Sequence, residues 1–161
     1  MNKWTAGLVA GFLATVVLSL LMVLKAMMGV APGFSVIAGN AALFAKLGTP
    51  TTSTWGWIWH FLIGTVAWGL LFAAIRDLLP GSSEPMRGLV FGLIAWVAMM
   101  VVWMPMAGKS LFAIPDPGMM ALVMTLVLHL IYGLVLGWVY ARVAPDGNGE
   151  NGENEQPAEA E

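Results

Sequence analysis

The 161-residue chain contains no cysteine, and only 10% of its residues are charged. The lack of cysteine excludes disulfide bonds, thiolate metal sites and cysteine nucleophiles. A soluble domain of this length could not cover its surface with so few charges, because soluble chains are typically about 25% charged. Hydrophobic residues make up 59% of the chain, and the mean hydropathy is +0.82. We therefore expect lipid to be the solvent for most of the chain.

Acidic residues are almost confined to the C-terminus, where six of the nine lie in the last 17 positions. None lies inside an apolar span, so the intramembrane carboxylates used by many ion-coupled transporters are missing. The chain also lacks a serine-nucleophile motif, a phosphate-binding loop and a metalloprotease helix motif. Its net charge of −2 gives no sign of a nucleic-acid partner. These absences favour a non-catalytic protein. A small-molecule transporter remains a possible function, ranked below the two that are given at the end of this section.

Four apolar spans stand out, at residues 4–24, 55–75, 88–108 and 118–141. Each has about 20 residues or more, enough for a helix to cross a hydrocarbon layer of about 30 Å. Helices are required because lipid offers no hydrogen-bond partner to backbone groups. The basic residues on the side of the termini are Lys3, Arg76, Arg87 and Arg142, and those on the opposite side are Lys25, Lys46 and Lys109. By the positive-inside rule, both termini are predicted to be cytoplasmic.

Two segments lie outside the four spans. The connection at 29–54 has apolar residues at helical spacing after Ser35, which predicts a short helix lying in the membrane interface. The last segment, 144–161, is acidic and low in complexity, and we expect it to be disordered. The predicted domains are thus a transmembrane bundle at 1–143 and a disordered acidic tail at 144–161.

The spans show an internal repeat. "GLVAGFLA" at 7–14 matches "GLVFGLIA" at 88–95, and a His-x-x-x-Gly element occurs at His60/Gly64 and again at His129/Gly133. This pattern predicts a tandem duplication, with repeat one at 4–79 and repeat two at 85–142. Two helices per repeat give both copies the same orientation, related by a pseudo-twofold along the membrane normal. The predicted fold is an all-α membrane protein of four transmembrane helices, arranged as two parallel-repeat helix pairs.

Glycines spaced four residues apart allow close approach of helix backbones in lipid. The glycines predicted to pack in this way are Gly7, Gly11, Gly88, Gly92, Gly133 and Gly137. Packing within the chain is favoured over dimerisation, because four spans can satisfy one another.

His60 and His129 are the two histidines, and each lies inside a span. Counted from Arg76 and Arg142, they lie about 24 and 20 Å from the same boundary, so a bundle could bring them face to face. One interpretation is a cofactor site, in which both histidines, with Gly64 and Gly133 one turn away, hold haem b. Another is a copper site, because thioethers with imidazoles suit copper(I). Its candidate ligands are His60, His129, Met99, Met100, Met104 and Met124.

Two further interpretations of the histidines stay open. Either residue could be structural, with its ring hydrogen-bonded across helices, and methionine is a common filler of apolar gaps. The pair could also line a pocket for a small apolar ligand or a quinone.

Three stretches, "HFLIGTVAWGLLFA", "FGLIAWVAMMVVWMPMAG" and "MTLVLHLIYGLVLG", resemble a family of small bacterial inner-membrane proteins of unknown function. The resemblance covers about residues 4–142. It implies a four-helix protein of the bacterial inner membrane and carries no known activity, cofactor or functional residue.

The leading functional prediction is a non-catalytic membrane subunit, scaffold or assembly factor that acts through helix–helix contacts. Its expected partners are the lipid bilayer and other membrane-protein subunits, with no nucleic acid. The alternative is a redox or metal-handling protein that binds haem b or copper through His60 and His129.

Overall fold

The computed structural model describes residues 1–115 and 117–144, and this part of the chain contains helices and no strands. Four of its helices are long and apolar enough to cross a membrane: Lys3–Met27, Ser53–Leu78, Glu84–Met106 and Met119–Val143. The predicted all-helical architecture with four spans is confirmed. The predicted disorder of 144–161 falls almost wholly outside the described residues.

Two of the four spans change helix type along their length. The first span is α1 (Lys3–Met27) and the fourth is α7 (Met119–Val143). The second consists of α3 (Ser53–Phe61), the π-helix η2 (Leu62–Trp68), α4 (Gly69–Ile75) and the 3-10 turn η3 (Arg76–Leu78). The third consists of α5 (Glu84–Ala98), the π-helix η4 (Met99–Trp103) and α6 (Met104–Met106). A 3-10 turn, η5 (Leu111–Ala113), lies in the connection before α7.

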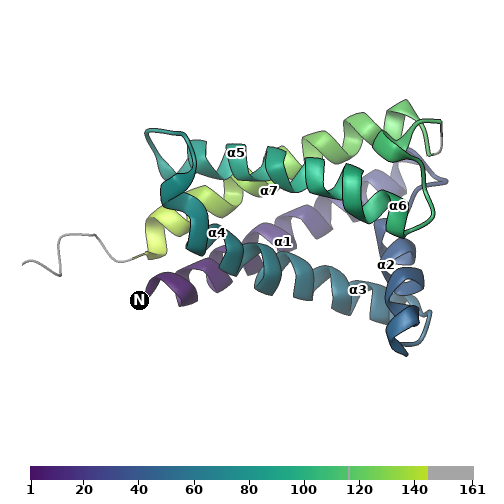
Figure 1. The fold of residues 1–161 in the computed structure, drawn as a ribbon, viewed down its shortest axis with the longest axis horizontal. Coiled ribbons are helices and arrows are strands. Elements are labelled where there is room, and N and C mark those ends of the chain that lie inside the picture. The colour runs from purple at the N-terminus through teal and green to yellow at the C-terminus, as the bar shows by residue number, and fades with distance from the viewer. Residues whose placement is uncertain (116, 145–161) are drawn as a thin grey trace, which may run out of the picture.

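The connection between the first two spans forms α2 (Val36–Phe44) and the 3-10 turn η1 (Ala45–Leu47). Ser35 caps α2 by accepting a hydrogen bond from the Ala38 amide at 3.2 Å, so the predicted helix after Ser35 is confirmed. α2 packs on α3 and lies across the end of the bundle, between α3 and α6 (Figure 1). Its predicted position in a membrane interface stays a prediction.

The helices pack in pairs. α1 lies against the second span and α7, and α7 also lies against α5 (Figure 1). The second and third spans meet at the end that carries the loop between them, where Phe91 contacts Trp68 and Phe72. We refer to this as the closed end of the bundle and to the end covered by α2 as the α2 end.

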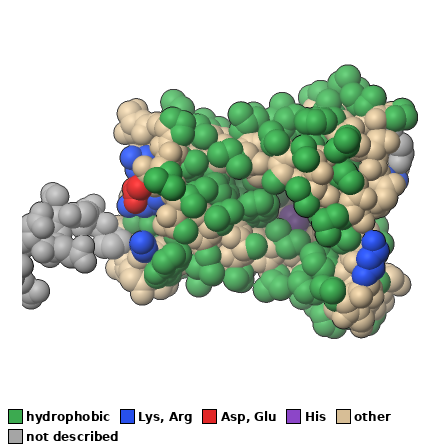
Figure 2. Space-filling model, viewed as in Figure 1, with side chains coloured by type: hydrophobic (Ala, Val, Ile, Leu, Met, Phe, Trp, Pro, Cys, Tyr) green, Lys and Arg blue, Asp and Glu red, His purple; other side chains and the backbone are tan. Residues whose placement is uncertain are grey.

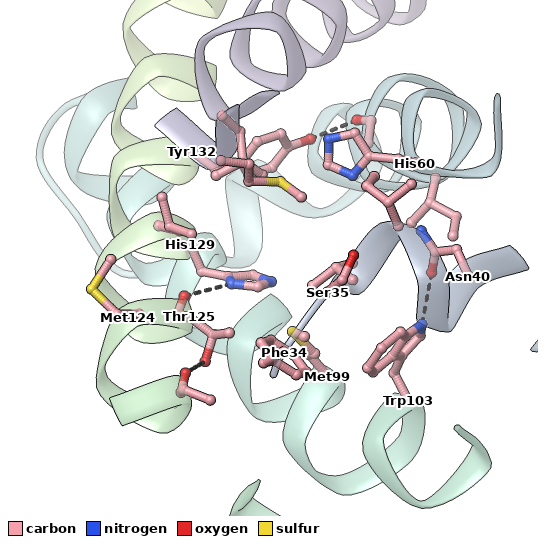
Figure 3. A pocket seen from close by; sticks show the side chains of 18 of the residues that line it. Phe34, Ser35, Asn40, His60, Met99, Trp103, Met124, Thr125, His129 and Tyr132 are labelled. Carbon is pink, nitrogen blue, oxygen red and sulfur yellow. Dashed lines mark hydrogen bonds between the residues drawn. The ribbon is translucent and has the colours of Figure 1, made fainter. Parts of the chain in front are cut away.

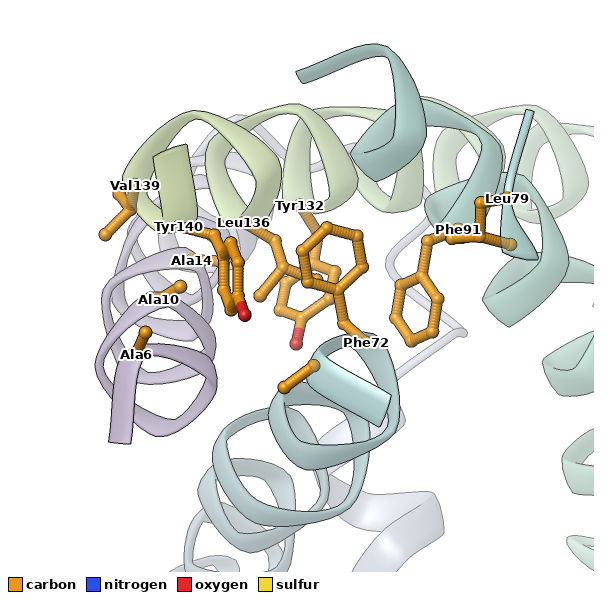
Figure 4. Close-up of a cluster of buried hydrophobic side chains, with 11 residues drawn as sticks. Ala6, Ala10, Ala14, Phe72, Leu79, Phe91, Tyr132, Leu136, Val139 and Tyr140 are labelled. Atoms are coloured by element: carbon orange, nitrogen blue, oxygen red, sulfur yellow. The ribbon is translucent and has the colours of Figure 1, made fainter. Parts of the chain in front are cut away.

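Aromatic side chains fill the closed end (Figure 4). The Phe72 ring lies edge-on to Phe91 and Tyr140, with centroids 5.3 and 5.4 Å away, and all three side chains are fully buried. On α1, Ala6, Ala10 and Ala14 are also fully buried. Small side chains on α1 let the large rings of the neighbouring helices fill the space between the spans.

The α5–α7 pair is in backbone contact through glycine. A methyl group added to Gly88 would overlap the carbonyl oxygen of Gly133, and one added to Gly92 would overlap that of His129. Gly137 meets the carbonyl of Glu84 in the same way. Such contacts are typical of small residues at helix interfaces in lipid.

Gly7 and Gly11 of α1 lie against the second span. A Cβ atom built on Gly7 lies 2.5 Å from the Gly69 oxygen, and one built on Gly11 lies 2.8 Å from the Thr65 oxygen. All six glycines singled out in the sequence therefore lie at contacts between spans.

The second and fourth spans can be aligned by their glycine contacts or by their His-x-x-x-Gly elements, and the two alignments differ. Gly69 faces Gly7 as Gly133 faces Gly88, and Thr65 faces Gly11 as His129 faces Gly92. His60 and His129 therefore do not hold equivalent places in the two helix pairs. The physical reason is that the glycines set the register of each contact, and the His129 backbone lies in such a contact whereas His60 does not. The duplication itself stays a prediction.

Charged side chains lie at the two ends of the molecule, and hydrophobic side chains cover the surface between them (Figure 2). At the closed end, Glu84 accepts hydrogen bonds from Arg76 at 2.6 Å and from Arg87 at 2.7 Å. The long apolar surface between the charged ends is what a multi-pass membrane protein requires.

Candidate functional site

A cavity of about 750 Å³ lies between the four spans and α2, on the side of the bundle toward α2. Its walls are mostly apolar. Both histidines line it, together with Thr15, Gly64, Thr125 and Tyr132. A cavity of this size, with an apolar wall and a few converging polar groups, is the usual form of a small-molecule site.

The two π-helices help to form this cavity. Ile63, Gly64 and Trp68 of η2 line one wall, and Met99, Val102 and Trp103 of η4 line another. A π-helical turn interrupts the regular hydrogen-bond ladder of an α-helix, and such turns are frequent at functional sites. Both interrupted turns border the same space.

Hydrogen bonds fix the tautomer of His60. Its Nε2 atom lies 3.1 Å from the Ser19 hydroxyl oxygen, and that hydroxyl donates its one hydrogen to the Thr15 carbonyl at 2.7 Å. Nε2 must therefore carry the proton and donate to Ser19. The lone pair of the neutral ring is then on Nδ1, which has no hydrogen-bond partner among the described residues.

His129 is fixed by a different contact. Its Nδ1 atom lies 2.7 Å from the Thr125 carbonyl oxygen, which can only accept, so Nδ1 donates. The lone pair of this ring is on Nε2, on the side of the ring turned toward the cavity (Figure 3). Each histidine thus keeps one nitrogen free as an acceptor.

Three of the hydroxyl groups around the cavity use their hydrogens on backbone carbonyls. Thr15 donates to Gly11 at 2.7 Å. Tyr132 donates to the carbonyl of Gly64, in the π-helix, at 2.6 Å. Thr125 likewise donates to the Ala121 carbonyl at 2.7 Å, one turn earlier in α7. These hydroxyls can accept a hydrogen bond from an occupant but have none left to donate.

Asn40 supplies a donor to the cavity. Its side chain is 2% exposed and lines the cavity from α2 (Figure 3). Its carbonyl oxygen accepts from Trp103 Nε1 at 2.9 Å. Its NH₂ group has no hydrogen-bond partner among the described residues, so it can donate to an occupant of the cavity.

The structure brings some of the predicted site residues together and not others. His60, His129, Gly64, Met99 and Met124 line the cavity. Gly133, Met100 and Met104 do not: Gly133 lies in the α5–α7 contact, and the two methionines are fully buried among other side chains. In the described part of the chain, no three His, Asp or Glu side chains are close enough to hold a metal ion together.

Sequence reasoning missed Asn40 and Tyr132. The signal for Asn40 was present, because it is the one amide side chain within the apolar stretch 36–44. Tyr132 is one of only two tyrosines in the chain, on the same helix as His129.

The cavity reaches the outer surface of the bundle. Val102 lines it and is also 54% exposed. Figure 2 shows a hollow in the middle of one face, with histidine atoms visible inside it. Apolar side chains surround this hollow, so in a membrane it would open toward the lipid.

No curated protein and no solved structure matches this chain. A family model does match it, over residues 1–150, and that model is described as a family of unknown function, DUF6789. The match spans all four apolar helices and both histidines. The chain is therefore a four-span, all-helical member of the DUF6789 family of unknown function.

Proposed function

We propose that this protein is a non-catalytic membrane protein that holds a small, largely apolar molecule in the cavity between its spans. The observation that carries the proposal is the cavity itself, which combines about 750 Å³ of apolar-walled space with unpaired polar groups. A packed bundle with a purely structural role would fill such a volume with side chains. A scaffold or subunit role through helix–helix contacts fits the same fold but leaves the cavity unexplained.

A cavity-filling variant tests this proposal. Ala98 lines the cavity, whereas Val97 beside it does not line the cavity and is 41% exposed. Proteoliposomes are irradiated with a decyl diazirine, and labelled residues are located by mass spectrometry. We expect the probe to label Ala121 and Thr125 in the wild-type protein. Labelling should fall to background in Ala98→Trp, because the indole occupies the space, and should persist in Val97→Trp.

Two results would contradict the proposal. The first is a wild-type protein in which neither Ala121 nor Thr125 is labelled, since both line the cavity and are at most 3% exposed. The second is unchanged labelling of these residues in Ala98→Trp.

We also propose the bacterial inner membrane as the location, with both termini in the cytoplasm. Arg76 and Arg87 support this orientation, because they flank the short loop between the second and third spans. The cysteine-free chain allows a direct measurement. In intact spheroplasts, an impermeant maleimide should label Thr51→Cys at once and Ser82→Cys only after lysis. The reverse pattern would invert the orientation.

The second candidate function is binding of haem b or copper. It is favoured by the two imidazoles that line one cavity and each keep a free nitrogen, with Met99 and Met124 also lining that cavity. The visible spectrum and the metal content of the purified protein decide it. A Soret band or stoichiometric copper that disappears in both His60→Ala and His129→Ala would replace the first proposal.

A further inference from the structure

We infer that the molecule held in the cavity is a lipid-soluble hydroquinone (a quinol), bound through its hydroxyl groups to His60 and His129. This inference rests on the proposed binding function and names its ligand class. It concerns binding alone.

The balance of hydrogen-bonding groups carries the inference. Two nitrogen lone pairs without a partner line the cavity, on His60 Nδ1 and His129 Nε2, and each can be satisfied only by a donor. The groups that can donate to an occupant include the NH₂ group of Asn40 and the hydroxyl of Ser35, which accepts from the Ala38 amide and keeps its hydrogen. An occupant that satisfies this set must donate at more than one point and accept at another.

A hydroquinone has this pattern. Its two ring hydroxyls can donate to two imidazole nitrogens, and either oxygen can also accept from an amide. The oxidised quinone has carbonyl oxygens at the same positions, which only accept, so it would leave both imidazole lone pairs unpaired. The cavity should therefore distinguish the two oxidation states of one molecule by their hydrogen-bonding capacity.

The walls suit a flat ring with an apolar tail. Trp57 and Trp103 line the cavity, and Phe34 lies edge-on to Trp103 with the ring centroids 6.5 Å apart. Aromatic walls favour a planar aromatic ligand. The hollow on the face of the bundle in Figure 2 gives an alkyl tail a way out into the lipid while the ring stays inside.

The anionic headgroup of a fatty acid or phospholipid is a poorer match for this site. The cationic side chain that lines the cavity is Lys25, and its ammonium group already donates to the carbonyls of Phe34 at 3.1 Å and Ala31 at 3.4 Å. Neutral imidazole lone pairs would also repel a carboxylate or phosphate oxygen. A neutral donor satisfies the site better.

The experiment compares decylubiquinol with decylubiquinone by anaerobic titration calorimetry on the full-length protein in detergent. We expect the quinol to bind about tenfold more tightly or better, the difference typical of one unpaired buried acceptor. His60→Phe and His129→Phe should each weaken quinol binding by about tenfold and leave quinone binding nearly unchanged. Asn40→Leu should weaken both forms, and the control Val97→Leu, outside the cavity lining, should change neither.

Equal affinity of the wild-type protein for the two forms would overturn the inference, and this comparison needs no variant. Quinol binding that is unaffected by both histidine substitutions would also overturn it. If neither form binds while the decyl diazirine still labels Thr125, the quinol inference fails and the proposed binding function stands. If the diazirine does not enter either, both fail.

Discussion

Replacing Gly88 with alanine is expected to destabilise the protein by about 1–3 kcal/mol, the typical cost of overpacking a tight core. The reason is the contact between α5 and α7, where a Cβ atom on Gly88 would overlap the carbonyl oxygen of Gly133. Backbone cannot move aside as a flexible side chain can, so the helices must separate. Alanine normally favours a helix over glycine by about 1 kcal/mol, which makes a loss of stability diagnostic of the contact.

A larger side chain should have a larger effect. We expect Gly88→Leu to abolish folding, so that the variant aggregates in size-exclusion chromatography in detergent. Thermal unfolding followed by circular dichroism measures Gly88→Ala. Gly33→Ala is the matched control, because no atom lies within 4 Å of a Cβ atom built on Gly33. If Gly88→Ala melts at or above the wild-type temperature, the two helices are not in backbone contact.

The glycine contacts also show why the sequence predicted so much of the fold. Lipid restricts a spanning segment to a helix, so four long apolar runs were enough to count the spans. Small residues spaced four apart then marked the surfaces that pack. Gly7, Gly11, Gly88 and Gly92 needed no further information, because close backbone approach depends on the missing side chain alone.

The candidate site was predicted only in part, for a physical reason. Hydropathy and residue spacing assume a regular helix, and the π-helical turns at 62–68 and 99–103 break that assumption. A π-turn changes which residues share a face beyond it. The regular helical spacing therefore did not predict that Gly69 lies in the contact with Gly7 of α1. Asn40 was missed for another reason: its role depends on α2 packing across the bundle end, a long-range contact that no local pattern encodes.

The closed end and the cavity lie between the same two spans. Aromatic rings join the second and third spans at the closed end, and the cavity separates the same spans toward α2. Trp68 takes part in both, since it contacts Phe91 and also lines the cavity. The bundle is therefore packed at one end and hollow toward the other, and its cavity opens at the side. This arrangement suits the proposed retention of a lipid-soluble molecule better than transport across the membrane.

Phe72→Ala tests whether the aromatic cluster at the closed end holds the spans together. Phe72 is fully buried and contacts Phe91 and Tyr140, so its removal leaves a gap among rings that cannot all repack. We expect a loss of about 2–3 kcal/mol. This is less than the about 3–5 kcal/mol typical of soluble cores, because lipid is itself apolar and only the packing part of the energy is lost.

Leu71→Ala is the matched control on the same helix, because Leu71 is 40% exposed and should contribute little. Thermal unfolding in detergent gives the comparison. Phe72 does not line the cavity, so the Phe72→Ala variant should still admit the decyl diazirine to Thr125 below its melting temperature. Equal melting temperatures for the two variants would show that the aromatic cluster does not hold the spans together. Loss of labelling in the folded Phe72→Ala protein would show that the closed end and the cavity are not separable parts of the bundle.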